Sequence, residues 1–183
     1  QFRAGNTADA MAELDNVPAD NWDAQYFIYR ASLLLYVGRE QEAQAELAQA
    51  LQKDDAKKSD VYALQTIIAI VQNHKERGLT LAQQAVQADP SSAAAQIALS
   101  YAQQAAFKLE PALQSAEQAA KLDPDNALAY ARIAELQLSQ GDLDKALVAA
   151  KKATDLNPNL ARTQSILGFS YLTRIDTENA RAT

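Results

Sequence analysis

The sequence predicts an all-α protein built as an array of stacked, antiparallel helix pairs. The first reason is a repeat: Pro90, Pro124 and Pro158 are evenly spaced, since 124 − 90 = 34 and 158 − 124 = 34. The second reason is that apolar and small residues recur three and four positions apart between these prolines, which is the spacing of one helix face. A fixed period of this length indicates stacked units, because a single helix pair buries its apolar face only against a neighbouring pair.

Residues 127–158 show the repeating unit most clearly. A first helix is predicted from Ala127 to the Gly141-Asp142 turn, because glycine interrupts helices. Its apolar or small face is formed by Tyr130, Ile133, Ala134 and Leu138. A second helix is predicted from Leu143 to Leu156, just before Asn157 and Pro158. Its face is formed by Leu143, Ala146, Leu147, Ala150 and Ala153.

The length of this unit and its residues resemble the tetratricopeptide repeat family, whose units are helix-turn-helix motifs of about 34 residues. Counted from Ala127, the matching residues are Tyr130 in the fourth place, Ile133 and Ala134 in the seventh and eighth, Gly141 in the fifteenth, Ala146 in the twentieth, Ala153 in the twenty-seventh and Pro158 in the thirty-second. The unit departs from the family at Ala150, where a large aromatic residue is usual. The resemblance implies a right-handed superhelical array of antiparallel helix pairs.

The same pattern divides the whole chain into one array of four complete and two partial repeats. The partial repeats are expected at 1–20 and 161–183, and the complete repeats at 22–56, 59–90, 93–124 and 127–158. A chain that opens in the middle of a repeat is expected to be a piece of a larger protein.

The N-terminal partial repeat is predicted to hold the end of one helix, a turn and a second helix that stops near Pro18. The residues behind this prediction are Phe2, Gly5, Ala10, Leu14 and Val17. The next repeat carries Phe27, Ala31 and Leu34 on its first helix, Gly38 at its turn, and Ala43, Leu47 and Ala50 on its second helix. Helical spacing on both sides of a glycine predicts a helix-turn-helix here as well.

The repeat at 59–90 is the least typical. Asn73-His74 stands where the turn glycine is usual, and Gly78 stands where alanine is usual. Because glycine inside a helix costs about 0.5 to 1 kcal/mol relative to alanine, the second helix is expected to start just after Gly78.

In the repeat at 93–124, Pro111 is compatible with a helix, because it falls in the first turn, where its missing N–H has no partner to lose. The last stretch, from Ala161 to Arg174, is predicted to be a first helix, with Leu167, Gly168 and Tyr171 in the family's places. Residues 176–183 are expected to start a second helix.

The boundaries between repeats carry turn and capping residues. Asp89, Asp123 and Asn157 precede prolines, and the residue before a proline is disfavoured in a helix. Ser92, Asn126 and Asn159 then follow as expected N-caps of the next helices.

Composition excludes several classes of protein. Lys and Arg total 17 against 23 Asp and Glu, so the net charge is −6 and neither nucleic acid nor an anionic membrane surface is an expected partner. No apolar run approaches the roughly 18 to 20 residues that cross a membrane, so direct membrane insertion is not expected. We expect a soluble protein, and its compartment stays open. The Ala- and Gln-rich helices suggest a bacterial protein, of either the cytoplasm or the periplasm.

The sequence lacks the combinations of residues that form catalytic or metal-binding sites. The chain has a single histidine, His74, and no cysteine, so neither a histidine or thiolate metal site nor a Ser-His-Asp arrangement is expected. The Asp54-Asp55 and Lys57-Lys58 pairs are explained by the electrostatics of helix ends. We therefore expect no catalytic residues, no metal and no cofactor.

The resemblance does imply a binding groove. In the family the second, fifth, ninth and twelfth residues of each unit face the concave surface. The candidate peptide-binding residues are Ile97, Tyr101, Gln104, Arg132, Glu135, Leu138, Arg162 and Phe169. We expect Tyr101 and Phe169 to anchor apolar side chains of an extended or helical peptide, and the charged residues to orient it. A clamp for a C-terminal carboxylate is not expected, because the Lys and Asn residues that form one are missing from these places.

Three alternatives stay open. Tight packing of the superhelix would bury part of the groove and leave a narrower site around Tyr101, Glu135 and Phe169. The second alternative is a self-assembly scaffold that forms homodimers or larger homo-oligomers through its terminal repeats. The third is an accessory array carried by an enzyme. If the groove binds a peptide, we expect Glu135→Lys to change binding with little effect on stability.

Overall fold

The computed structural model describes residues 7–53 and 56–173, and in these ranges the chain is helical throughout, without a β-strand. The helices are α1 (Thr7–Asp15), the short 3-10 helix η2 (Ala19–Asn21), α2 (Ala24–Tyr36), α3 (Glu40–Ala50), α4 (Lys58–Val71), α5 (Lys75–Ala88), α6 (Ala93–Ala105), α7 (Leu109–Leu122), α8 (Ala127–Gln140), α9 (Leu143–Leu156) and α10 (Ala161–Thr173). The predicted all-α fold class is confirmed.

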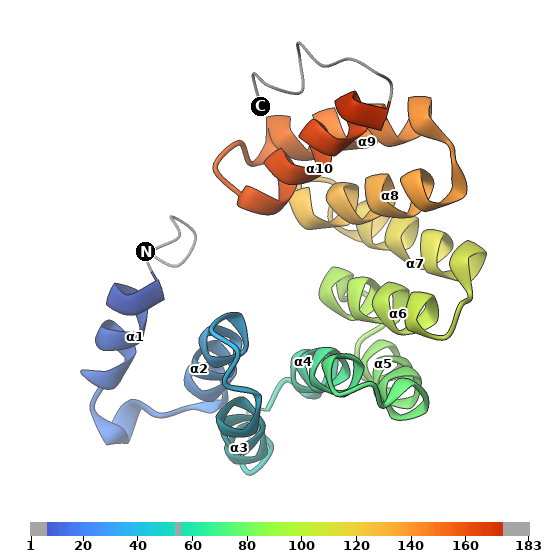
Figure 1. Ribbon diagram of the computed structural model, residues 1–183. Coiled ribbons are helices and arrows are strands. Elements are labelled where there is room, and N and C mark those ends of the chain that lie inside the picture. Colours follow the sequence, from blue (N-terminus) through green and yellow to red (C-terminus); the bar gives the residue numbers. More distant parts are fainter. Residues whose placement is uncertain (1–6, 54–55, 174–183) are drawn as a thin grey trace.

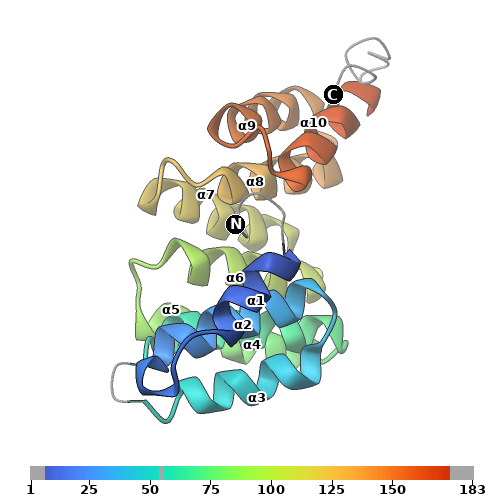
Figure 2. The ribbon, with the colours of Figure 1, turned by 90° about the vertical axis from the view of Figure 1, so that its left-hand side faces the viewer.

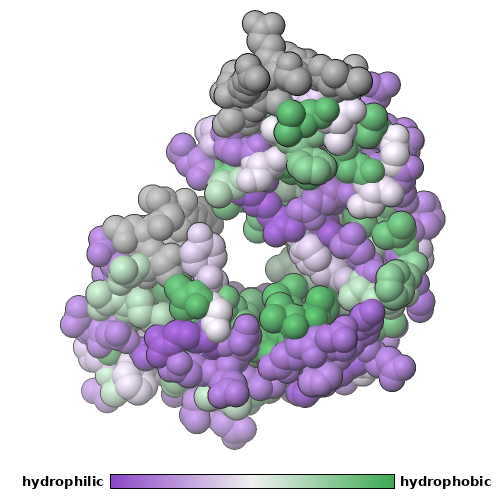
Figure 3. Space-filling view, viewed as in Figure 1, coloured by the Kyte–Doolittle hydropathy of each residue, from purple (hydrophilic) through white to green (hydrophobic). Residues whose placement is uncertain are grey.

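The helices pack as consecutive pairs, α2 with α3, α4 with α5, α6 with α7 and α8 with α9, and the pairs follow one another along an arc (Figure 1). The first helices of successive pairs also pack on one another, α4 against α6, and α10 adds to the end of the array by packing on both α8 and α9. The view turned by 90° shows the same stacking of pairs (Figure 2). The space-filling view shows that the arc encloses an open space between its two arms (Figure 3).

The core is built largely from alanine. Ala129, Ala134 and Ala150 are fully buried in one cluster with Leu136 and Leu167. Small side chains allow helix axes to approach closely, and the interior is then filled to the density of a close-packed solid. Ala150, where the family usually has a large aromatic residue, therefore lies in a contact with no room for one.

Ala134→Leu tests this close packing. We expect the larger side chain to lower the free energy of unfolding by about 1 to 3 kcal/mol, because extra methylene groups strain a filled core. Urea unfolding would measure the loss, and Ala161→Leu, at an exposed position of α10, is the matched control with an expected effect of less than about 0.5 kcal/mol. Equal midpoints for the wild type and Ala134→Leu would contradict the packing argument.

The turns inside the four helix pairs share a left-handed backbone conformation. Its φ is +76° at Gly38, +59° at Asn73, +60° at Phe107 and +82° at Gly141. The sequence predicts the two glycine turns, and asparagine is also tolerated in this conformation. Phenylalanine at the same place is unexpected, because a large L side chain is strained there.

The structure corrects the expected start of the helix around Gly78. Helix α5 begins at Lys75, so Gly78 lies inside it. The physical reason is the close approach of α4 and α5, since a Cβ atom on Gly78 would lie 3.3 Å from Ile70 Cγ1. Glycine destabilises helix α5 at this position, but it allows α4 and α5 to pack closely.

Two of the three predicted N-caps are confirmed. Ser92 Oγ accepts the N–H of Ala95, and Asn126 Oδ1 accepts the N–H of Ala129. Asn159 instead donates its backbone N–H to Asn157 Oδ1, two residues before α10 begins. The cap prediction fails there because this side chain of Asn157 stabilises a turn before the helix.

Other predicted elements can be checked against the helix bounds. Pro111 is the third residue of α7 and lies in its first turn, as expected. The expected turn around Phe2 and Gly5, and the second helix expected in 176–183, lie outside the described residues.

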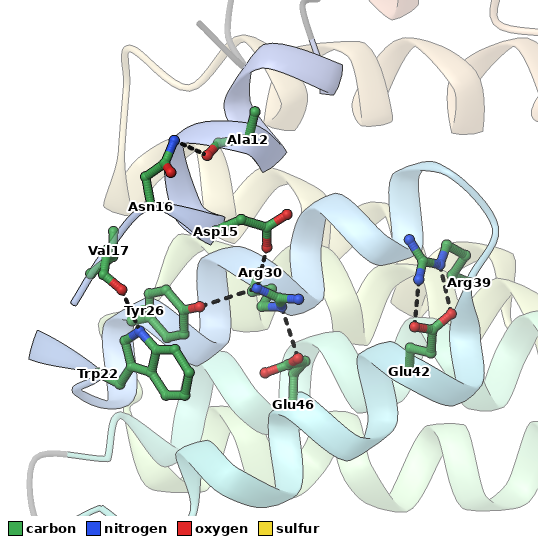
Figure 4. A network of polar contacts seen from close by, with 10 residues as sticks. All are labelled: Ala12, Asp15, Asn16, Val17, Trp22, Tyr26, Arg30, Arg39, Glu42 and Glu46. Carbon is green, nitrogen blue, oxygen red and sulfur yellow. Dashed lines mark hydrogen bonds and ion pairs between the residues drawn. The ribbon is translucent and has the colours of Figure 1, made fainter. Parts of the chain in front are cut away.

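Arg30 of α2 connects the first three α-helices (Figure 4). Its Nη1 donates to Asp15 Oδ1 of α1 at 2.6 Å and to the Tyr26 hydroxyl at 3.1 Å. Its Nε lies 2.9 Å from Glu46 Oε1 of α3, an ion pair without the alignment of a hydrogen bond. One side chain therefore holds α1 against the first complete pair.

An aromatic cluster supports the same junction. Trp22 stacks on Tyr26 with ring centroids 5.2 Å apart, and its indole N–H donates to the Val17 carbonyl at 3.0 Å (Figure 4). Phe27 meets both rings edge to face. These contacts fix the loop around η2, which sequence periodicity does not address.

Candidate functional site

An open hollow of about 390 Å³ lies along the row of first helices α6, α8 and α10. Its lining residues are Tyr101 and Gln104 of α6, Arg132, Glu135, Leu138 and Ser139 of α8, and Arg162, Ile166 and Phe169 of α10. Residues three and four apart share one helix face, which explains why each helix contributes such a set. We refer to it as the α6–α10 hollow.

Seven of the eight candidate binding residues line this hollow. Ile97 does not, and it packs instead against the core cluster of α7 and α8. Ser139 and Ile166 complete the lining and are missing from the sequence prediction. Ile166 is four residues after Arg162 and three before Phe169, so helical spacing would have identified it.

Two guanidinium groups lie over the ring of Tyr101. Arg132 Cζ is 3.9 Å and Arg162 Cζ is 5.3 Å from the ring centroid. Such cation–π contacts are attractive, more so where water is excluded. Burial raises the pKa of the Tyr101 phenol, and the nearby Glu135 carboxylate raises it further. Tyr101 is therefore a neutral, fixed platform at the base of the hollow.

Arg132 is the most deeply placed charge, with only 2% of its side chain exposed. Its Nε donates to Ser100 Oγ at 2.9 Å, and its Nη2 donates to the Ser100 carbonyl at 3.2 Å. Its Nη1 donates to Glu135 Oε2 at 3.0 Å. Burial lowers the pKa of the Arg132 guanidinium, because desolvation disfavours the charged form. Arg132 thus joins α8 to α6 beneath the hollow and positions Tyr101 and Glu135.

Glu135 bridges the two arginines. Its Oε2 accepts from Arg132, and its Oε1 lies 2.6 Å from Arg162 Nη2. The structure revises the expectation that Glu135→Lys leaves stability unchanged. A lysine there would leave the buried guanidinium without its carboxylate and add a third cation, so we now expect the variant to be destabilised.

The apolar side of the hollow is more accessible than its charged base. Phe169 is 60% exposed, and Leu138 and Ile166 are half-buried. Leu172, one turn further along α10, is also exposed. Figure 3 accordingly shows apolar side chains at the surface over α10. The hollow can therefore offer an apolar contact surface beside the half-exposed Arg162.

The fifth place of the unit, which the family pattern assigns to the groove, is closed to solvent in three repeats. Ile28, Ala63 and Ala131 are buried at 7% exposure or less. Tight packing therefore removes part of the expected groove surface, and this agrees with the alternative of a narrower site around Tyr101, Glu135 and Phe169.

The described residues hold no group of three or more His, Asp or Glu side chains placed to bind a metal ion. His74 lies exposed at the start of α5. Each helix within residues 7–53 and 56–173 is too short or too polar to span a membrane.

Comparisons with known proteins agree with this architecture. A family model described as tetratricopeptide repeat matches residues 115–148, from within α7 to within α9. No curated protein matches the chain in sequence.

Several solved structures share the fold. A thermophilic tetratricopeptide repeat protein of Thermus thermophilus, TTC0263, superposes with a TM-score of 0.75 at 19% identity, over 87% of each chain. MamA from Desulfovibrio magneticus RS-1 gives 0.60 at 19% identity, over 87% of this chain and 89% of its own. YrrB, described as a tetratricopeptide repeat protein with an unusual peptide-binding site, gives 0.54 at 21% identity, over 97% and 88%. The superhelical fold class and the resemblance to the tetratricopeptide repeat family are thus confirmed.

Proposed function

We propose that this array of tetratricopeptide repeats is a protein-interaction module that binds a peptide segment of a partner in the α6–α10 hollow. The observation that carries the proposal is the side-by-side placement of exposed Phe169, half-buried Leu138 and Ile166, and the half-exposed guanidinium of Arg162. Apolar anchors beside a small number of oriented polar groups are typical of peptide-binding surfaces.

The chemistry of the hollow indicates which segment it would take. Phe169, Leu138 and Ile166 suit one large apolar side chain. Arg162 uses Nη2 for Glu135, and a guanidinium has five N–H donors, so further donors are available to a ligand. The preferred ligand is therefore an extended or helical peptide with a large apolar residue near a carbonyl or carboxylate acceptor.

The rigid base of the hollow favours such binding. Arg132, Glu135 and Tyr101 hold one another through hydrogen bonds, an ion pair and ring stacking. A preformed surface loses little conformational entropy when a ligand binds, so more of the contact energy appears as affinity. The description of YrrB as having a peptide-binding site supports the idea that an array of this fold can hold a peptide.

The proposal predicts a specific loss of peptide binding in Phe169→Ala. A random peptide display library would be selected against the chain, and the enriched peptides tested against both proteins. We expect the peptides to share a large apolar residue and to bind Phe169→Ala about 10- to 100-fold more weakly, which is the loss typical of an interface hot spot. Because Phe169 is 60% exposed, its removal is not expected to change the melting curve.

The matched control is Phe107→Ala, which removes an exposed phenyl ring on the α6–α7 turn, outside the hollow. Tyr101→Ala is a weaker test, because it also removes the platform on which Arg132 packs. Peptides that bind Phe169→Ala as well as they bind the wild type would place the binding surface elsewhere. A selection that yields no shared motif would also count against the proposal.

The alternative function is a self-assembly scaffold that uses its terminal repeats. It is favoured by one observation, the exposure of Phe169 and Leu172 on α10, the last helix that the structure describes. A homodimer through this face would have twice the mass of one chain, and Leu172→Glu would dissociate it. Peptide binding that persists in Leu172→Glu would separate the two functions.

A further inference from the structure

The charged residues of helices α6, α8 and α10 are few, and all of them meet in the α6–α10 hollow. Helix α6 carries no charged residue, α8 carries Arg132 and Glu135, and α10 carries Arg162. These three side chains line the hollow together. Two cations and one anion give the hollow a net charge of +1, in a chain whose overall net charge is −6. The described turns at the ends of these helices hold other charged residues, which do not line the hollow: Asp89, Lys108, Asp123, Asp125 and Asp142.

The uncompensated charge of the hollow is presented to solvent by Arg162. Both carboxylate oxygens of Glu135 are engaged, Oε2 with Arg132 at 3.0 Å and Oε1 with Arg162 at 2.6 Å. Arg132 is 2% exposed, whereas Arg162 is 44% exposed and has N–H donors besides the Nη2 that contacts Glu135. One carboxylate of a ligand would balance the charge of +1. Charge-assisted hydrogen bonds are stronger than those to a neutral carbonyl, so a carboxylate is the preferred acceptor.

The apolar part of the hollow lies at a fixed distance from this charge. Arg162 and Phe169 both line the hollow from α10 and are seven residues apart, which is about two helical turns. With a rise of 1.5 Å per residue, their Cα atoms are separated by about 10 Å along the helix. Ile166 lies between them, and Leu138 of α8 lines the same hollow. A ligand that contacts both ends therefore needs an acidic group and an apolar group about 10 Å apart.

A helical ligand matches this spacing, whereas an extended strand does not. Residues seven apart in a helix share one face and lie about 10 Å apart. In a strand, residues about 10 Å apart are three positions apart and point to opposite faces. The hollow is also lined by helices alone, so it offers side chains and no strand edge with which an extended peptide could pair.

We propose that the segment bound in the α6–α10 hollow is an amphipathic helix with an acidic residue and a large apolar residue seven positions apart. The acidic side chain pairs with Arg162. The apolar side chain packs on Phe169, Ile166 and Leu138. This inference rests on the proposed function and adds the charge, the conformation and the register of the ligand. An acidic side chain within the segment also differs from a C-terminal carboxylate held in a clamp.

Peptides enriched by display selection against the chain supply the probes. We expect them to carry Asp or Glu seven positions from a large apolar residue. One of them is synthesised with three analogues, in which the acid is replaced by its amide, the acid is replaced by lysine, or a proline is placed midway between the two residues. Fluorescence anisotropy measures the binding of each peptide to the wild type.

The amide and proline analogues test charge and conformation separately. We expect the amide to bind about 3- to 10-fold more weakly at low salt, because it loses an ionic contact that water partly screens. The proline analogue should bind at least about 10-fold more weakly, because proline interrupts a helix. An amide that binds as well as the acid would overturn the pairing with Arg162, and a proline analogue of full affinity would overturn the helical register.

Arg162→Glu is the charge-exchange test. It changes the net charge of the hollow from +1 to −1, since Arg132 then faces two carboxylates. We expect this variant to bind the lysine analogue more tightly than the acidic parent, which reverses the preference of the wild type. Lys108→Glu is the matched control, because it makes the same change at an exposed position outside the hollow and should keep the wild-type preference. Circular dichroism checks that both variants fold.

The inference and the proposed function fail through different results. Enriched peptides that lose affinity for Phe169→Ala but lack the acidic residue would overturn the inference and leave the proposed function standing. The same holds if Arg162→Glu keeps the wild-type preference for the acidic peptide. Peptides that bind Phe169→Ala as well as the wild type would instead count against the proposed function, whatever their charge.

Discussion

Replacing Arg132 with alanine is expected to lower the free energy of unfolding by about 3 to 5 kcal/mol, the loss typical when one partner of a buried ion pair is removed. The side chain is 2% exposed, and its guanidinium donates to Ser100 twice and to Glu135 once. Alanine would leave the Ser100 carbonyl without this donor and would open a cavity under Tyr101. Urea unfolding at neutral pH measures the effect as a shift in the midpoint.

The matched control is Arg162→Ala. Arg162 pairs with the same carboxylate and faces the same ring, but its side chain is 44% exposed. Water and salt screen such a pair, so we expect a loss of about 1 kcal/mol or less. Equal losses for the two variants would mean that burial of Arg132 contributes nothing to the stability of the array.

A third replacement, Arg132→Met, separates charge from packing. Methionine fills part of the space and has no desolvation cost, and burial already lowers the pKa of the Arg132 guanidinium. We expect it to recover part of the stability lost in Arg132→Ala. If methionine were no better than alanine, the hydrogen bonds to Ser100 and Glu135 would account for the whole loss.

Leu136→Ala is expected to cost about 2 to 5 kcal/mol. Leu136 is fully buried in α8 and packs with Ile133, Ala150 and Leu167. Truncation removes buried methyl groups and leaves a cavity that the helices fill only in part. Thermal and urea unfolding would both report the loss.

The same truncation at Leu172 serves as the control. Leu172 lies on α10 with 54% of its surface exposed, so Leu172→Ala is expected to change stability by less than about 0.5 kcal/mol. A small effect at Leu136 would indicate that the surrounding helices collapse into the vacated space, contrary to the close packing of the alanine-rich core.

The helices and their order could be predicted because the signals that define them are local. Gly38 and Gly141 end helices through a left-handed residue, and Ser92 and Asn126 cap the helices that follow. Each of these effects depends on a few neighbouring residues, so spacing alone reveals it. Gly78 could not be read in this way, because its reason is the distance between α4 and α5, which depends on tertiary packing.

The hollow was predictable in part. Residue spacing selects the faces of α6, α8 and α10, so seven of eight candidate residues come together there. Residue spacing does not reveal how deeply each side chain is buried. The sequence therefore did not show that Arg132 is buried and Arg162 half-exposed, or that Ile97 packs on the core and Phe169 is exposed. The Arg30 junction was also missed, since its partners Asp15 and Glu46 lie on different helices and follow no periodic pattern.

The position of Phe107 in its repeat indicates an unusual turn, which hydrophobic periodicity alone does not reveal. Phe107 occupies the fifteenth place of its repeat, which is Gly141 in the next one. A phenylalanine in a place that usually requires a positive φ predicts an unusual turn from the sequence alone. Its exposure and its neighbour Lys75 depend on the fold and could be read only from the structure.

The bond between Arg132 and Ser100 spans 32 residues and ties one helix pair to the next. In a linear array, overall stability is the sum of each repeat's own stability and the coupling energies between nearest neighbours. Strong coupling at one boundary makes the repeats on either side melt as one cooperative block, whereas weaker boundaries allow the ends to fray first. The pairs α6–α7 and α8–α9 should therefore unfold together and not one after the other. A ligand bound across that boundary would delay its melting further, since only the stacked form can hold it.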